Sequence, residues 1–353
     1  MSAEGEYEAF NRHRRLFLLL LAVAIFGVIV LTVSYGDYRI DYLEIIKCLF
    51  FMDIGSTEHV VIWNIRMPRV VAGILVGSAL GVSGAVMQSI LRNPLASPYT
   101  LGISNSAAFG AAFALMASYW GIFSGTVLEE ILSGVYGMSL FAFLFSLIAV
   151  GVIIVLSRLT LVTPEAMVLM GVALGAIFSA GLSSLQYFAD DQTLASMVYW
   201  QFGDLAKASW NKLLLLFIVW TPVVLYFMYK IWDYNAMDAD EDVASSMGIN
   251  VKGERLLGMI AASVVTAVCI SIAGIIGFIG LLGPHIVRRV VGNDNRYLIP
   301  GSMMLGALIL LVADMIGRFM LPVIIPVGII TSFLGGPLFI YILIRGYRRN
   351  AEN

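Results

Sequence analysis

Long runs of uncharged residues, separated by short polar segments, organise most of this chain. The clearest run, 70–91, holds 22 residues without a charge, which is enough to cross the hydrocarbon core of a bilayer as one helix. It follows Arg69 and ends at the polar turn 92–95, where Pro94 prevents the helix from continuing. The pattern therefore predicts a membrane-spanning helix that ends at a fixed turn.

Further runs of the same kind predict ten membrane crossings in all. The run 256–287 has 32 uncharged residues, which as one helix would measure about 48 Å against a bilayer core of about 30 Å. Its glycines between 274 and 283, together with Pro284, predict a break into one full span and a shorter one. The remaining expected spans are 16–33, 99–128, 131–157, 166–189, 213–229, 297–318 and 327–344, and a polar loop is expected over 35–64.

The first run, 16–33, follows Arg12, Arg14 and Arg15, as the core of a signal peptide would. Its 18 residues exceed the usual signal core of about 7 to 15, and no small-x-small cleavage site follows it. We therefore expect a retained membrane span.

Three glycines inside the run 70–91 predict how that helix packs. Gly73, Gly77 and Gly81 repeat every fourth residue, so they share one helical face. Small residues on one face let a neighbouring backbone approach closely inside a membrane. We expect this helix to be packed against other helices and not surrounded by lipid.

Composition agrees with this pattern and excludes a soluble globular protein. Of the 353 residues, 60% are hydrophobic and 12% are charged, the mean hydropathy is +0.91, and soluble proteins carry about 25% charged residues. A net charge of −2 gives no indication of a nucleic-acid partner. Cys48 and Cys269 form neither a disulfide framework nor a metal site. The sequence predicts an all-α, polytopic membrane protein with one domain over 1–353 and no bound metal.

The basic residues predict the orientation of the chain in the membrane. With ten spans and a cytoplasmic N-terminus, 14 of the 21 lysines and arginines lie on the cytoplasmic side, in agreement with the positive-inside rule. If the run 256–287 crossed only once, 9 would lie there. We expect a multi-pass protein of the cell membrane with both termini in the cytoplasm.

The longest polar interruption of the second half, 233–255, contains the segment DADEDVASSMG at 238–248. Asp238 can cap a short helix, and acidic residues suit the first turn of that helix. Val243 and Met247, four residues apart, share a face, and Gly248 can end the helix. The pattern fits either a solvated loop or a short helix that contacts a partner protein. None of the five lysines follows a glycine, so the chain has no phosphate-binding loop of the GxxxxGK[ST] type.

Motifs spread along the chain resemble those of the FecCD-type permeases, which import iron-siderophore complexes, haem and cobalamin. The first are RMPR (66–69), GxxxGxALxxSGxxxQ (73–88) and RNPLASPYTLGIS (92–104). WQFGDLAKASW (200–210), GFIGLLGPHIVR (277–288), LLVADMIGR (310–318) and PVGIITSFLGGPLFIYIL (326–343) follow in the family's order. The resemblance covers nearly everything after residue 60.

The resemblance implies the permease subunit of a binding-protein-dependent ABC importer that works by alternating access. Such a chain is not an enzyme and holds no cofactor. It pairs with a second copy of itself, with two ATP-binding cassette subunits that use ATP and Mg, and with an extracytoplasmic substrate-binding protein. An iron(III)-siderophore is the expected cargo, and cobalamin, haem and molybdate remain open. An ion-coupled secondary transporter is less favoured, because Asp314 is the only acid in an expected span and Arg318 lies four residues after it.

The same resemblance implies roles for three groups of residues. Arginines at the outer end would dock the binding protein, although membrane arginines also extend to the lipid headgroups without any partner. A cytoplasmic gate would lie in the turn after the 70–91 span, where a plain helix cap is equally compatible. At a second family gate this chain reads TPEAM (163–167), which departs from the family's hydroxyl residues. The implied residues are Arg66, Arg69 and Arg318 for docking, Asp240, Glu241, Val243, Ala244, Met247 and Gly248 for coupling to the ATPase, and Asn93 and Leu95 for the gate.

Overall fold

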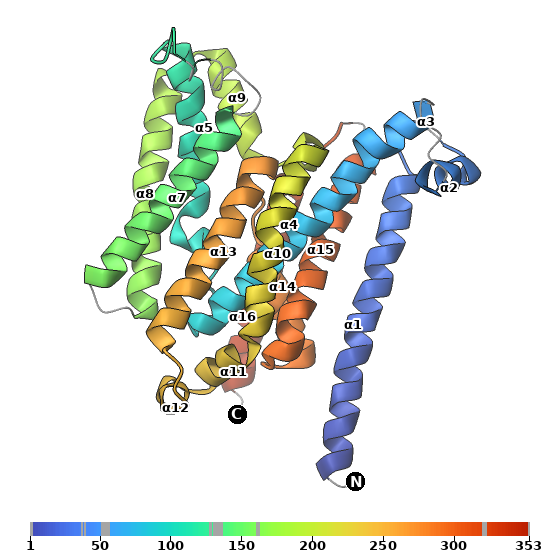
Figure 1. Cartoon of the computed structure of the whole chain (residues 1–353), viewed down its shortest axis with the longest axis vertical. Helices are drawn as coiled ribbons and strands as arrows, with labels where there is room; N and C mark the ends of the chain where they lie inside the picture. Colours follow the sequence, from blue (N-terminus) through green and yellow to red (C-terminus); the bar gives the residue numbers. More distant parts are fainter. Residues whose placement is uncertain are drawn as a thin grey trace.

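The computed structural model describes residues 3–36, 38, 40–50, 57–126, 129, 137–159, 163–319 and 323–351, and every regular element in these ranges is a helix. Figure 1 shows most of them side by side as a bundle, with both chain termini at one end. We call that end, where α11 and α12 also lie, the terminal end. The opposite end, where α2, α3 and α9 lie, is the distal end. The predicted all-α fold is confirmed.

The helices follow one another along the chain with few long connections. Their bounds are α1 (Ala3–Ser34), α2 (Tyr42–Phe50), α3 (Thr57–Val60), the π-helix η1 (Val61–Arg66), α4 (Met67–Ile90), the 3-10 turn η2 (Pro98–Leu101), α5 (Ile103–Tyr119), α7 (Gly137–Leu159), α8 (Pro164–Phe188), α9 (Asp191–Gln201), the 3-10 turn η3 (Leu205–Lys207), α10 (Trp210–Tyr229), α11 (Ile231–Ala239), α12 (Glu241–Ser246), α13 (Val251–Ala273), α14 (Ile279–Val291), α15 (Asn295–Phe319) and α16 (Val327–Ala351).

Seven helices in the described ranges are long and apolar enough to cross a membrane: α1, the continuous helix from α3 to α4, α7, α8, α10, α13 and α15. The other three expected spans coincide with α5, α14 and α16. Of these, α14 has only 13 residues, in agreement with the expected short span after a break. The break itself lies where Gly274 adopts a φ of +77°. The first residues of the expected span 131–157, namely 131–136, lie outside the described ranges.

The predicted polar loop 35–64 is wrong in part, because α2 lies within it and a continuous helix already begins at Thr57. The reason is amphipathic packing. In α2, Ile45 and Cys48 are buried on one side, whereas Leu43 and Phe50 are exposed. Apolar and polar residues alternate too irregularly over this segment to resemble a membrane span. Its buried apolar side chains nevertheless pack in one cluster with residues of α1 and α4, and this packing holds α2 in place.

Helix α4 is the central element of the bundle and is buried along nearly its whole length. The expected close approach at its glycine face is confirmed. A Cβ atom at Gly77 would lie 2.5 Å from the carbonyl oxygen of Gly306 in α15, and one at Gly81 would overlap the carbonyl of Ser302. Gly84 meets α14 in the same way, at the carbonyl of Gly280. Only glycine permits backbones to come this close.

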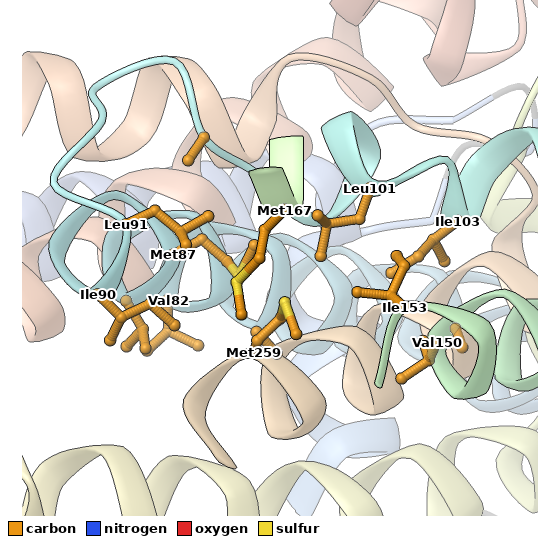
Figure 2. Packing of buried hydrophobic residues seen from close by; sticks show 14 of the residues in the cluster. Val82, Met87, Ile90, Leu91, Leu101, Ile103, Val150, Ile153, Met167 and Met259 are labelled. Carbon is orange, nitrogen blue, oxygen red and sulfur yellow. The ribbon is translucent and has the colours of Figure 1, made fainter. Parts of the chain in front are cut away.

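The last turns of α4 lie in the largest buried apolar cluster of the described residues. Figure 2 shows Met87, Ile90 and Leu91 beside Met167 of α8 and Met259 of α13. All five side chains are at most 1% exposed. This packing fixes the end of α4 and the start of the turn that follows it.

Candidate docking, coupling and gate sites

Four charged side chains from three parts of the chain meet at the distal end. The Nε atom of Arg69 donates to both carboxylate oxygens of Asp314, at 2.8 and 3.0 Å. The terminal nitrogen Nη2 of Arg69 lies 3.5 Å from Asp204, and Nη1 of Arg318 lies 4.0 Å from Asp314. The Asp314 side chain is only 2% exposed. We call these four residues the distal cluster.

The distal cluster both confirms and extends the expected pairing of Asp314. Arg318, four residues along α15, does lie beside it, but Arg69 is the nearer partner. Two arginines around one carboxylate leave one excess positive charge, which Asp204 balances, so the formal charge of the cluster is zero. Two of the three expected docking arginines therefore lie together.

Arg66, the third expected docking residue, has different partners. Its side chain is buried, and its guanidinium donates to the carbonyls of Val33 and Tyr38 at 2.5 Å and of Ser34 at 3.3 Å. Val33 and Ser34 belong to the last turn of α1, whose carbonyls lack partners within the helix. A cation there is also favoured by the helix dipole. Arg66 thus joins the end of α1 to the start of α4.

At the terminal end, the expected short helix is present as α12. The carboxylate of Asp240 accepts hydrogen bonds from the backbone N–H groups of Asp242 (2.8 Å) and Val243 (3.3 Å). Gly248, with a φ of +84°, follows its last turn. The expected cap was Asp238, which is wrong, because Asp238 belongs to α11. The N-cap is Asp240, which can turn away from α11 in an extended conformation.

The side chains of α12 divide into a buried and an exposed set. Ala244 is fully buried against the bundle, whereas Val243 is 50% and Met247 is 67% exposed. Glu241 forms an ion pair with Arg255 of α13. The helix therefore presents two apolar side chains outward while its inner side is held by the bundle.

Asp238 connects α11 to two long helices. Its carboxylate accepts hydrogen bonds from the Ser89 hydroxyl of α4 (2.9 Å) and the Asn295 side-chain amide of α15 (3.1 Å). Burial raises the pKa of Asp238, and the positive charge of Arg288 opposes that rise.

Lys230, between α10 and α11, forms hydrogen bonds with Asp233 and Glu254. These hydrogen bonds raise the pKa of Lys230, so this lysine stays charged.

The expected gate residues lie in one turn after α4. Arg92 adopts a φ of +45°, and the Asn93 side-chain oxygen accepts a hydrogen bond from the backbone N–H of Leu95 at 2.9 Å. Leu95 is 43% exposed. The Asn93 side chain thus stabilises the turn itself, and Leu95 is presented at its surface.

The expected second gate lies close to α12. Thr163 caps α8 by accepting a hydrogen bond from Ala166 at 3.3 Å, and Pro164 occupies the first turn, where it fits. Thr163 and Pro164 share with Glu241 and Arg255 the wall of a cavity of about 420 Å³. The start of α8 and α12 are therefore neighbours.

Sequence reasoning missed a contact that orders the break between α13 and α14. The Tyr99 hydroxyl donates to the Ile276 carbonyl (2.5 Å) and accepts from the Ile276 N–H (3.2 Å). Two residues later, Phe278 adopts a φ of +67°, which is rare for an aromatic residue. A cavity of about 180 Å³ lies between Tyr99 and Phe278. Tyr99 belongs to the motif RNPLASPYTLGIS (92–104), but the spacing of that motif does not indicate Ile276 as a partner.

The comparison with known families decides the class of this protein. Residues 19–345 match the FecCD transport family. The chain belongs to this family. Together with the ABC transporter permeases among its relatives, this makes it a permease of an ABC importer, that is, a transport component.

Curated relatives match most of this FecCD-family chain, and two of them are named for different cargoes. It is 46% identical over 351 residues to the provisionally named ABC transporter permease protein MJ0087 of Methanocaldococcus jannaschii, covering 99% of this chain and 100% of that one. It is 36% identical over 286 residues to the hemin transport permease HmuU of Yersinia pestis (80% and 83% covered). It is 32% identical over 341 residues to the molybdate import permease MolB of Haemophilus influenzae (94% and 96% covered). The hemin and molybdate permeases thus differ in the cargo for which they are named, although both are similar to this chain.

A solved structure shares the fold. It is an inward-facing ABC transporter provisionally assigned to the metal-chelate type, with a TM-score of 0.79 and 29% identity, covering 93% of this chain and 98% of that chain. The arrangement of helices in this FecCD-family chain is thus that of an ABC transporter permease.

Proposed function

We propose that two copies of this chain form the membrane path of an importer that carries an iron(III)-siderophore-type metal chelate into the cytoplasm by alternating access. Two ATP-binding cassette subunits hydrolyse Mg-ATP, and an extracytoplasmic binding protein delivers the chelate. The terminal end, with both termini and α12, then faces the cytoplasm. The metal-chelate type of the structural relative supports this cargo, whereas the hemin and molybdate relatives support the alternatives.

The observation that carries the proposal is the exposed apolar pair formed by Val243 of α12 and Met247, the C-cap residue of that helix. The helix is capped by Asp240 and seated on the bundle through the buried Ala244. Two apolar side chains that stay exposed to water beside acidic residues contribute no free energy of burial. They would be stabilised in an apolar groove of a partner, the usual way in which an amphipathic helix is bound. An ATPase subunit is the partner that an ABC permease requires at this end.

Changing both Val243 and Met247 to Asp should leave the chain inserted and folded, because neither side chain is buried. Copurification of the ATPase subunit should fall at least about tenfold, since two charges would enter an apolar groove. Pull-down with a tagged permease, followed by ATP-driven uptake, measures both effects. The matched control compares Val243→Asp alone with Ser245→Asp, which adds the same charge on the other side of α12. Normal ATPase binding by the double variant would remove α12 as the coupling helix.

We further propose that Arg66, Arg69 and Arg318 attract acidic residues of the binding protein to the distal end. Reversal of all three to Glu should weaken binding, and the wild-type affinity should fall as salt rises. Because these arginines also have partners within the chain, the informative variant is a charge swap. Changing the facing acids of the binding protein to Arg should restore binding to the reversed permease, which a purely internal role does not predict.

Lys47→Glu provides the control for that experiment, because Lys47 is an exposed base of α2 that pairs with Glu44 on the same helix. Titration of the permease with the binding protein on a biosensor, at low and at high salt, gives the affinities. A triple variant that folds and binds the binding protein with unchanged affinity at low salt would rule out docking through these residues.

A further inference from the structure

A buried arginine joins the coupling helix to the last residue of α4. Arg255, the fifth residue of α13, is only 2% exposed. Its terminal nitrogen Nη2 pairs with the carboxylate of Glu241, the first residue of α12, and its Nε donates to the backbone carbonyl of Ile90 at 2.9 Å. We call these three groups the Arg255 bridge.

The Ile90 end of the bridge is chemically suited to an arginine. The last carbonyls of a helix have no partner within it, and a cation at this end is favoured by the helix dipole. The planar guanidinium can reach a carbonyl with one edge and a carboxylate with another, which a lysine ammonium cannot do as well. Ile90 is followed directly by the turn 92–95 that holds Asn93 and Leu95. The bridge therefore ends at the base of the candidate gate.

Side-chain packing joins the same elements. A Cβ atom at Gly258, one turn after Arg255, would lie 3.2 Å from the Cδ1 atom of Ile90, so α13 and α4 touch closely there. Ile90 itself is fully buried in the cluster that Figure 2 shows. Well-packed groups of this kind move as one body. A displacement of Arg255 would thus carry the end of α4 with it.

A second connection runs parallel to the first. Asp238, close to the end of α11, accepts hydrogen bonds from Ser89, the neighbour of Ile90, and from Asn295 of α15. The two elements that flank Asp240 are therefore both tied to the last turn of α4. By contrast, the outer edge of the bridge is accessible, because the Glu241 side chain is 38% exposed.

We infer that Arg255 is the positioning residue that transmits the movement of α12 to the end of α4 and so to the turn 92–95. This inference rests on the proposed function, since it takes α12 to be the element that the ATPase moves. Without Arg255, α12 still presents Val243 and Met247 to the ATPase. The permease then still binds the ATPase and supports ATP hydrolysis. Hydrolysis, however, is no longer coupled to the gate.

The first experiment follows the turn directly in the full complex with the ATPase. Cys48→Ala and Cys269→Ala remove the two native thiols, and Arg92→Cys places a reporter at an exposed position of the turn. Maleimide labelling is measured without nucleotide and with ATP and vanadate. The labelling rate should change at least fivefold with nucleotide, and Arg255→Met should reduce this change to less than twofold. In that variant the ATPase should copurify and hydrolyse ATP within twofold of wild type, while uptake falls at least tenfold.

Two further variants distinguish the effect of breaking the Arg255 bridge from the effect of removing a buried charge alone. Glu241→Ala leaves Arg255 in contact with Ile90 and should uncouple without unfolding, which keeps the inference testable if Arg255→Met does not fold. The swap of Glu241→Arg with Arg255→Glu restores an ion pair, but a carboxylate cannot donate to the Ile90 carbonyl. The swap should therefore remain uncoupled.

A control on the same turn of α13 is Glu254→Gln, which breaks the pair of Glu254 with Lys230 (2.7 Å). It should leave uptake and the labelling response within twofold of wild type. The inference is wrong if the Arg255→Met variant keeps the nucleotide-dependent change in labelling rate, or if the swap restores uptake. It is also wrong if the labelling rate at position 92 does not change with nucleotide in a complex that imports its cargo. If the wild-type chain binds no ATPase, the proposed function itself is wrong.

Discussion

Replacing Gly84 with leucine is expected to abolish the folded protein. Gly84 lies in the last third of the buried helix α4, and a Cβ atom there would overlap the carbonyl group of Gly280 in α14. Extra side-chain atoms in a packed core already cost about 1–3 kcal/mol. Here the obstacle is backbone, which cannot rotate away, so α4 and α14 would have to separate. Thermal unfolding in detergent and the yield of monodisperse protein measure this effect.

The matched control is Gly151→Leu in α7, since a Cβ atom there would meet nothing within 4 Å. Leucine is at least as good a helix former as glycine, so this variant should unfold at or slightly above the wild-type temperature. Equal behaviour of the two variants would show that α4 and α14 are not in backbone contact.

The second large effect is expected for Asp314→Ala. The Asp314 carboxylate is buried between Arg69, at 2.8 and 3.0 Å, and Arg318, at 4.0 Å. Its removal leaves two guanidinium groups near each other without their common counter-charge. Loss of one partner of a buried ion pair costs about 3–5 kcal/mol. The free energy of unfolding in mild detergent, or the midpoint of thermal unfolding, should fall accordingly.

Asp204→Asn tests whether burial is the reason for that loss. Asp204 lies 3.5 Å from Arg69 but its side chain is 27% exposed, so its removal should cost about 0–1 kcal/mol. Adding Arg69→Met to Asp314→Ala should recover part of the stability, because one unpaired charge is then removed as well. Asp204→Asn and Asp314→Ala variants of equal stability would contradict the distal cluster as described.

The sequence predicted those features that depend on local pattern. Uncharged runs located the long helices, the spacing of Gly77 and Gly81 indicated the packed face of α4, and Gly274 marked the break before α14. The same reasoning failed over 35–64, because a helix that extends beyond the bilayer, as at Thr57, no longer needs an apolar sequence.

Contacts between distant parts of the chain could not be predicted in this way. Arg69 and Asp314 are 245 positions apart, and Arg255 and Ile90 are 165 apart. Each pair meets only because α4 packs against α13 and α15. The pattern showed a charge that needed a partner, but only the fold assigns the partner. For the same reason Asp238 was mistaken for the cap of α12, although its partners lie on α4 and α15.

Uptake into proteoliposomes tests most directly whether this chain is the permease of an ATP-driven metal-chelate importer. The tagged chain is reconstituted with the ATPase that copurifies with it, ATP and Mg are enclosed on the ATPase side, and the binding protein is added on the other side with a ferric siderophore, cobalamin, haemin or molybdate. With ion gradients collapsed by ionophores, the ferric siderophore should accumulate only when ATP, the binding protein and an intact Val243–Met247 pair are all present. Accumulation driven by an ion gradient without ATP would contradict an ABC importer, and ATP-driven uptake of another cargo in its place would contradict the proposed chelate.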